Sequence, residues 1–213
     1  MLGADDGVVS TASLVVGVAA ASATKEATLV AGVAGLLAGA LSMAAGEYVS
    51  VSSQRDVERA DIARERRELT ADPPGELGEL TRIYQQRGLD AELARKVAEQ
   101  LSARDRLAAH MRDELGLDEA TRARPLQAAT VSAASFASLA VLPIATLLVA
   151  PAPLRIVLVA LVSLVGLGVL GALGGYLGGA PMGRAALRVT LGGGFAMAVT
   201  ALIGKLLSVA GIG

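Results

Sequence analysis

The charged residues of this 213-residue chain are confined to one part of it. Of 39 charged side chains, 30 lie between Tyr48 and Gln127, and the other 133 residues carry only nine. A water-soluble protein needs charge over its whole surface, whereas a chain that meets both lipid and water separates apolar from charged segments. The sequence therefore predicts an all-α polytopic membrane protein with one charged, water-exposed insert.

Five apolar stretches are long enough to cross the hydrocarbon core of a bilayer, which takes about 20 helical residues. Short links join the first stretch to the second and the third to the fourth, so each pair should form an antiparallel hairpin. Glycine and alanine are frequent in these stretches, which is typical of helices that pack closely in lipid. The expected spans are residues 2–23, 27–48, 128–150, 156–177 and 187–209.

The insert between the second and third spans predicts a small helical bundle. The expected organisation is residues 1–48 for the first two membrane helices, 49–126 for the insert, and 127–213 for the last three. Within the insert, Asp72-Pro73-Pro74-Gly75 predicts a turn, because proline and glycine interrupt helices, and Asp90 is a typical helix N-cap.

Basic residues predict the orientation of the bundle. The insert holds 14 Arg and Lys, and Arg184 and Arg188 lie in the short link between the fourth and fifth spans. The links on the opposite side carry only Lys25 and Arg155. Because basic residues accumulate in cytoplasmic links, we expect a cytoplasmic N-terminus and insert, and a C-terminus on the other side.

Composition argues against several classes of function. The chain has no cysteine and one histidine, and its net charge is close to zero. Thiolate sites are therefore excluded, and nucleic-acid binding has no electrostatic basis. No Glu-x-x-His pair occurs, so we expect neither a di-iron nor a hydrolytic enzyme site.

Carboxylates at helical spacing form a candidate metal site in the insert. Two Glu-x-x-Glu pairs flank the predicted turn, so the turn can bring them face to face. Carboxylates with a thioether suit divalent first-row metals. The alternative is a solvated helix paired with its neighbouring arginines. The candidate ligands are Glu65, Glu68, Glu76, Glu79, His110, Met111 and Glu114.

Three residues in the first two spans are candidates for a cation path. Asp6 lies near the start of the first span, and Met43 lies one helical turn before Glu47 in the second. An acidic residue within a membrane span indicates function by default, because its charge is costly there. The alternatives are an interfacial position for the acids and ordinary packing for the methionine.

At these residues the sequence resembles the vacuolar iron transporter family, which includes bacterial proteins and plant nodulin-like members. The resemblance covers nearly the whole chain. It is carried by Gly3-Ala4-Asp5-Asp6-Gly7-Val8-Val9-Ser10-Thr11, by the run from Ala38 to Ser50, by Ser53-Gln54-Arg55-Asp56 and by Glu114-Leu115-Gly116. The chain starts at Met1-Leu2-Gly3, without the short amphipathic helix that usually precedes the first span in the family.

The resemblance implies a homodimer of five-helix protomers that moves Fe²⁺, and secondarily Mn²⁺, out of the cytoplasm in exchange for protons. Asp6 and Met43 would line the path, and the acidic insert would bind the metal, with His110 where some members have a second methionine. The partners implied are the lipid bilayer, divalent metal ions, protons and a second copy. No prosthetic group is implied, and Zn²⁺ and Co²⁺ are further candidate cargoes.

The same residues bear on whether the protein transports metal, and the composition bears on which membrane contains it. The alternative to a transporter is a membrane-anchored protein that binds or senses iron without moving it. Asp6, Met43 and Glu47 argue against that alternative, because a simple anchor has no use for them. The overall composition favours a bacterial plasma membrane as the location.

Overall fold

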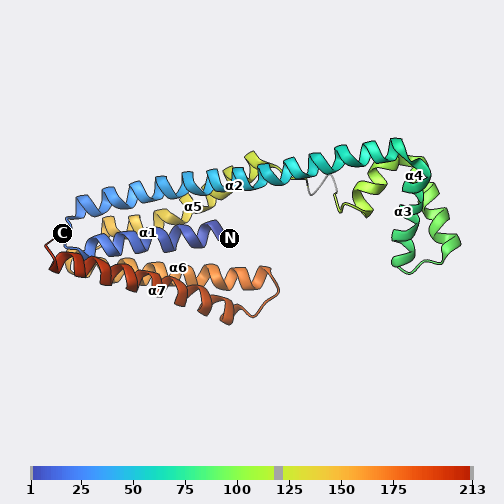
Figure 1. Ribbon diagram of the computed structural model, residues 1–213. Coiled ribbons are helices and arrows are strands. Elements are labelled where there is room, and N and C mark those ends of the chain that lie inside the picture. Colours follow the sequence, from blue (N-terminus) through green and yellow to red (C-terminus); the bar gives the residue numbers. More distant parts are fainter. Residues whose placement is uncertain (1, 118–121, 212–213) are drawn as a thin grey trace. The chain divides into compact units, whose positions relative to one another are not determined.

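A computed structural model of the chain describes residues 2–117 and 122–211. Nearly all of this part is helical and no strand occurs within it, which confirms the all-α prediction. In chain order, the helices are α1 (Leu2–Ala20), α2 (Lys25–Ala71), α3 (Pro73–Gln86), α4 (Ala91–Asp113), α5 (Pro125–Val149), the short 3-10 helix η2 (Ala152–Leu154), α6 (Arg155–Leu177) and α7 (Met182–Val209) (Figure 1).

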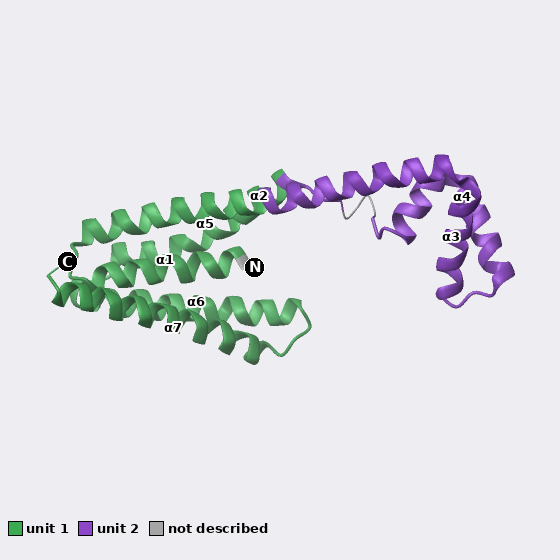
Figure 2. Ribbon diagram, viewed as in Figure 1, with its two compact units in different colours: residues 1–48, 126–213 green, residues 49–125 purple. Residues whose placement is uncertain are grey.

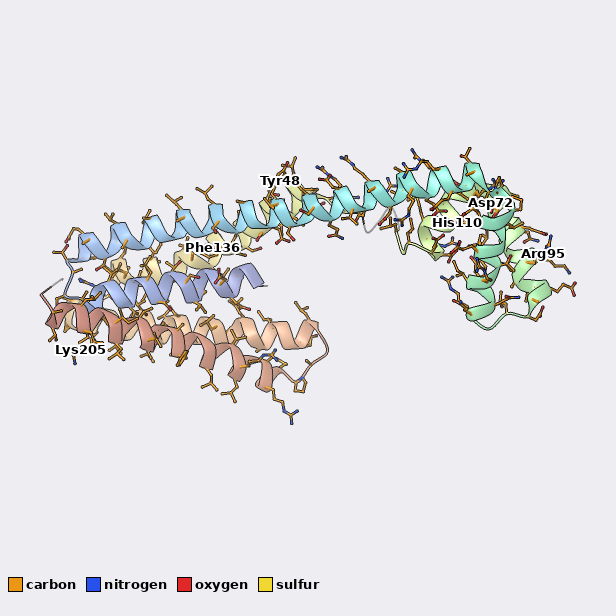
Figure 3. All side chains as sticks on the ribbon, in the orientation of Figure 1. Tyr48, Asp72, Arg95, His110, Phe136 and Lys205 are labelled. Atoms are coloured by element: carbon orange, nitrogen blue, oxygen red, sulfur yellow. The ribbon has the colours of Figure 1, made fainter. Side chains whose placement is uncertain are left out.

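The helices form two compact units, which Figure 2 colours separately. Unit 1 comprises residues 1–48 and 126–213, and unit 2 comprises residues 49–125. Helix α2 contributes to both units, because it runs without interruption through residue 48. Side-chain nitrogen and oxygen atoms concentrate on unit 2 in Figure 3, as the distribution of charge along the sequence requires.

Unit 1 is the membrane part of the protein. Four of its helices, α2, α5, α6 with the preceding η2, and α7, are long and apolar enough to cross a bilayer. Large apolar side chains such as Leu41, Leu191 and Phe195 point outward, each at least 63% exposed, as is expected where the surrounding solvent is lipid. Helix α1 has 19 residues and includes Asp5 and Asp6; it is not among these four helices, so the fifth span stays a prediction.

Glycines set the closest helix crossings in unit 1. A Cβ on Gly204 of α7 would collide with the backbone oxygen of Gly17 in α1. A Cβ on Gly171 of α6 would lie 2.8 Å from the Cα of Ala186 in α7. Close backbone approach of this kind is how helices associate in lipid, where no hydrophobic force draws them together. A Cβ on Gly7 of α1 would likewise collide with the backbone oxygen of Phe136 in α5, so α1, α5, α6 and α7 form one tightly packed set.

Local capping signals define the helices of unit 2. Asp72 caps α3 by accepting a hydrogen bond from the Gly75 amide at 3.0 Å, and Asp90 caps α4 through the Leu93 amide at 2.9 Å. Helix α4 leaves helical geometry at Asp105, whose carboxylate accepts a hydrogen bond from the Ala108 amide and restarts the helix.

Helices α3 and α4 of unit 2 pack on each other around a small apolar core. Leu80 and Tyr84 on α3, and Ala94 and Ala98 on α4, follow the i, i+4 spacing of an amphipathic helix face, and Ala109 joins them from the part of α4 after Asp105. The core residues are Leu80, Tyr84, Ala94, Ala98 and Ala109.

Candidate metal centre

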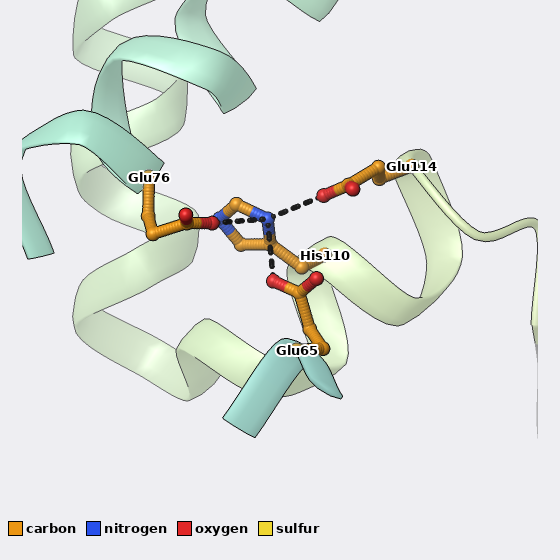
Figure 4. A group of neighbouring side chains, drawn as sticks. All are labelled: Glu65, Glu76, His110 and Glu114. Atoms are coloured by element: carbon orange, nitrogen blue, oxygen red, sulfur yellow. Dashed lines mark hydrogen bonds and ion pairs between the residues drawn. The ribbon is translucent and has the colours of Figure 1, made fainter. Parts of the chain in front are cut away.

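Four candidate ligands meet in unit 2. Glu65 comes from α2, Glu76 from the first turn of α3, His110 from the last turn of α4, and Glu114 follows α4 directly (Figure 4). One donor atom from each residue lies within 4.8 Å of every other. Three separate helices thus bring three carboxylates and one imidazole to a single point, an arrangement suited to a divalent cation.

The imidazole of His110 cannot form a hydrogen bond with each of the carboxylates around it. His110 Nδ1 lies 2.9 Å from Glu114 Oε2, 3.0 Å from Glu65 Oε1 and 3.8 Å from Glu76 Oε2. A ring nitrogen carries at most one proton, and the hydrogen bond at this nitrogen is made with Glu114. Glu65 Oε1 is consequently buried without a hydrogen-bond partner in the described part of the chain. A positive ion at this point would satisfy it.

Burial and crowding of like charge perturb the acids. The side chains of His110 and Glu65 are 0% and 2% exposed, and that of Glu76 is 14% exposed. Burial, followed by the negative charge of Glu114, raises the pKa of Glu65 to about 7. Burial is also the main cause of the raised pKa of Glu76. A proton therefore competes for the same oxygen atoms that a metal would use.

The remaining predicted ligands lie outside this group of four. The Glu68 side chain is 49% exposed and lies 3.9 Å from Arg64, as the alternative of a solvated, salt-bridged helix describes. Glu79 lines a neighbouring surface cavity together with Glu114. Met111 is buried. Glu68 and Glu79 are close enough for their charges to raise the pKa of Glu76, so they add negative potential without joining the cluster.

A second set of contacts holds the end of α4 in place. Asp113 accepts hydrogen bonds of 2.6 Å from Tyr84, Arg87 and Arg112. Desolvation acts to raise the pKa of Asp113, but these hydrogen bonds outweigh it and lower that pKa to about 2. Because Asp113 precedes Glu114, this anchor also fixes one of the four cluster residues. Spacing in the sequence gave no signal for it, since the donors come from two helices.

Two of the three candidates in the membrane spans share a cavity. Asp6 and Met43 both line a cavity of about 160 Å³ between α1, α2 and α5. Glu47 is exposed on α2 and does not line it. Residues that the sequence analysis did not select complete the lining: Ser10, Thr11, Leu14, Gly35, Gly39, Ser42 and Phe136. Two four-residue spacings would have pointed to some of them: Ser10 follows Asp6 on α1, and Gly35 and Gly39 precede Met43 on α2.

Comparison with known proteins gives matches along the whole chain. The VIT family profile matches residues 1–205. The chain is 46% identical to the vacuolar iron transporter of Acanthamoeba castellanii over 209 residues, which are 97% of this chain and 76% of that protein. It is 38% identical to vacuolar iron transporter homolog 1 of Oryza sativa subsp. japonica, covering 100% of this chain and 74% of that protein.

A third relative extends the likeness to another plant. Vacuolar iron transporter homolog 2 of Arabidopsis thaliana is 34% identical over 100% of this chain and 84% of its own length. The family resemblance drawn from the motifs of the first two spans is thereby confirmed. The chain, an integral membrane protein, belongs to the VIT family.

Proposed function

We propose that this protein transports divalent metal, Fe²⁺ first and Mn²⁺ second, out of the cytoplasm in exchange for protons. The names of its relatives describe iron transporters, which supports metal as the cargo. The observation that carries the proposal is the cluster of Glu65, Glu76, His110 and Glu114 in unit 2. It would collect the cation before the cation enters unit 1.

The chemistry of the cluster supports this choice of cargo. Carboxylate oxygens suit Mn²⁺ and other hard dications, and an imidazole suits Fe²⁺ and Zn²⁺. Three ionised carboxylates carry more negative charge than one dication can neutralise. The negative potential of the cluster would therefore attract a dication. The cluster residues and Asp6, Met43 and Glu47 are the residues that we propose for binding and translocation.

Competition between protons and cations supports exchange. A dication binding among carboxylates displaces protons, since one oxygen lone pair cannot hold both. The pKa of Glu65, about 7, sets this competition near neutral pH. We propose that acidic groups in unit 1 are reloaded by protons from the opposite side of the membrane.

The exposure of Asp6 supports a homodimer. Asp6 and Ser10 lie on an exposed face of α1 in the single chain, although α1 belongs to the membrane unit. A carboxylate that faces lipid costs several kcal/mol, whereas one that faces protein or water in an interface does not. A second copy covering this face would place the cavities of the two protomers at their interface.

Uptake into proteoliposomes tests the proposal. Vesicles containing the protein should accumulate Fe²⁺ and Mn²⁺ only when a pH gradient is imposed, and Asp6→Ala should abolish the flux. Flux that is independent of the gradient would refute proton exchange. No flux for either metal, with metal binding retained, would instead support the alternative of an iron-binding or sensing protein anchored in the membrane.

A further inference from the structure

The cavity between α1, α2 and α5 contains a buried hydroxyl group without a partner. Thr11 is 1% exposed and lines this cavity. Its Oγ1 atom is buried, and nothing in the described part of the chain forms a hydrogen bond with it. A buried polar group normally has a partner, because leaving it unsatisfied destabilises the folded state.

Thr11 differs from most other threonines of this protein. In a helix, a threonine hydroxyl usually donates to the carbonyl four residues earlier. Six others do so: Thr28, Thr70, Thr81, Thr130, Thr146 and Thr200. For Thr11 that carbonyl belongs to Gly7, and no such bond forms. The Thr11 hydroxyl is therefore left without a hydrogen-bond partner in the described part of the chain.

The other polar residues that line the cavity offer further ligand atoms. Asp6 contributes a carboxylate, Met43 a thioether, and Ser10 and Ser42 two further hydroxyl groups. Ser10 Oγ lies 2.7 Å from the Asp6 backbone oxygen and 2.9 Å from Asp6 Oδ1, so its single proton is shared between the helix backbone and the carboxylate. Neutral oxygens in the wall would replace part of the hydration shell of a cation bound beside Asp6.

Apolar side chains close the cavity on both sides of these groups. A Cβ on Gly35 would collide with Leu14, and a Cβ on Gly39 would collide with the ring of Phe136. The two glycines thus let apolar side chains of α1 and α5 pack against α2. These apolar side chains leave Asp6, Ser10, Thr11, Ser42 and Met43 as the residues of the lining that can offer ligand atoms.

We propose that Thr11 supplies a neutral oxygen ligand to the divalent cation that passes Asp6 and Met43. This inference rests on the proposed transport function and adds a residue to its path. A hydroxyl oxygen is a hard ligand, so it favours Mn²⁺ and Fe²⁺ over softer ions, against the preference of the Met43 thioether. Thr11 would therefore influence selectivity as well as affinity.

Three variants of the full chain test this role in proteoliposomes. Thr11→Val removes the hydroxyl and keeps the shape, whereas Thr11→Ser keeps the hydroxyl. Ser163→Ala is the matched control, because Ser163 is also buried with an unpartnered hydroxyl but does not line the cavity. Melting temperatures of all variants in detergent report whether the fold is retained.

Thr11→Val should raise the KM for Mn²⁺ about tenfold, because losing one interaction between a hydroxyl and a charge weakens binding by about that factor. It should lower the ratio of Mn²⁺ to Zn²⁺ transport, a change that a purely structural role would not cause. Thr11→Ser and Ser163→Ala should transport like the wild type. A Thr11→Val variant with wild-type KM and selectivity, or an equal loss in Ser163→Ala, would overturn the proposal.

Equilibrium binding separates this inference from the transport function itself. Mn²⁺ titration of the full chain in detergent, with Glu65→Gln and Glu76→Gln present to weaken the site in unit 2, reports the cavity in unit 1. If the wild type binds metal but moves none, the transport function fails, while weaker Mn²⁺ binding by Thr11→Val still supports the ligand role. Equal Mn²⁺ binding with and without the hydroxyl would refute that role.

Discussion

Neutralising Glu65 should weaken metal binding and at the same time stabilise the metal-free protein. Glu65→Gln keeps the size of the side chain and removes its charge. The carboxylate is 2% exposed, and burial followed by repulsion from Glu114 raises its pKa from 4.5 to about 7. The ionised form of Glu65 is therefore costly in the folded protein unless a cation is present.

The pKa shift gives the size and sign of the effect on stability. A shift from 4.5 to about 7 corresponds to about 3 kcal/mol. The folded state binds the Glu65 proton more tightly than the unfolded state does. The stabilisation from this proton is fully present below the unfolded pKa and is lost as pH rises through 7. Glu65→Gln should thus raise the free energy of unfolding by about 3 kcal/mol at pH 8, but only by about 1 kcal/mol at pH 5.

The same proton controls metal affinity. In the wild type the proton must leave Glu65 before a cation binds, so the apparent affinity for Mn²⁺ should fall about tenfold for each pH unit below 7. The Glu65→Gln variant should bind more weakly than the wild type at pH 8. Its affinity should also depend less on pH between 6 and 8, because that proton is no longer displaced.

Calorimetric titration with Mn²⁺ and thermal unfolding of the metal-free protein, both in detergent from pH 5 to 8, measure the two effects. Glu68→Gln is the matched control, because it removes the same charge from the same helix at a side chain that is 49% exposed. It should change both quantities far less. A Glu65→Gln variant that melts like the wild type at pH 8, or keeps the full pH dependence of binding, would refute the reasoning.

Three further substitutions test other parts of the structure. Gly39→Ala should destabilise unit 1 by about 1–3 kcal/mol, because the new methyl group meets Phe136, whereas Gly46→Ala, with nothing within 4 Å, should leave the melting temperature unchanged. Asp113→Asn should lower the free energy of unfolding by about 2 kcal/mol at pH 7, with the difference disappearing as pH falls toward 2; chemical denaturation measures it. His110→Ala should reduce Zn²⁺ affinity more than Mn²⁺ affinity in competitive titrations, since Mn²⁺ prefers oxygen ligands; equal losses would contradict the ligand role of the imidazole.

Local features of the fold were predictable from sequence because their causes are local. Asp90 caps α4, as predicted, and α2 ends just before the predicted turn at Asp72, although α3 already begins at Pro73 within that turn, with Asp72 as its cap. Each of these signals acts through a backbone amide two or three residues away, so no knowledge of the tertiary packing is needed.

Which of the predicted acidic residues join the metal cluster depends on how the helices pack, and the spacing of the residues in the sequence does not determine that packing. Both members of each Glu-x-x-Glu pair were predicted as ligands, but only Glu65 and Glu76 meet His110. On α3 the buried positions are Leu80 and Tyr84, so Glu76 continues that i, i+4 row and Glu79 falls beside it. The contact of α3 with α4 distinguishes Glu76 from Glu79, and burial beside His110 distinguishes Glu65 from the exposed Glu68 on α2.

The glycine crossings of α1 bear on how the protein moves. Backbones in direct contact cannot slide past one another without separating, so α1, α5, α6 and α7 should behave as one rigid body. Asp6 and Thr11 belong to that body, whereas Met43 is carried by α2. We therefore expect opening and closing of the cavity to arise from displacement of α2, with the oxygen ligands of α1 remaining stationary.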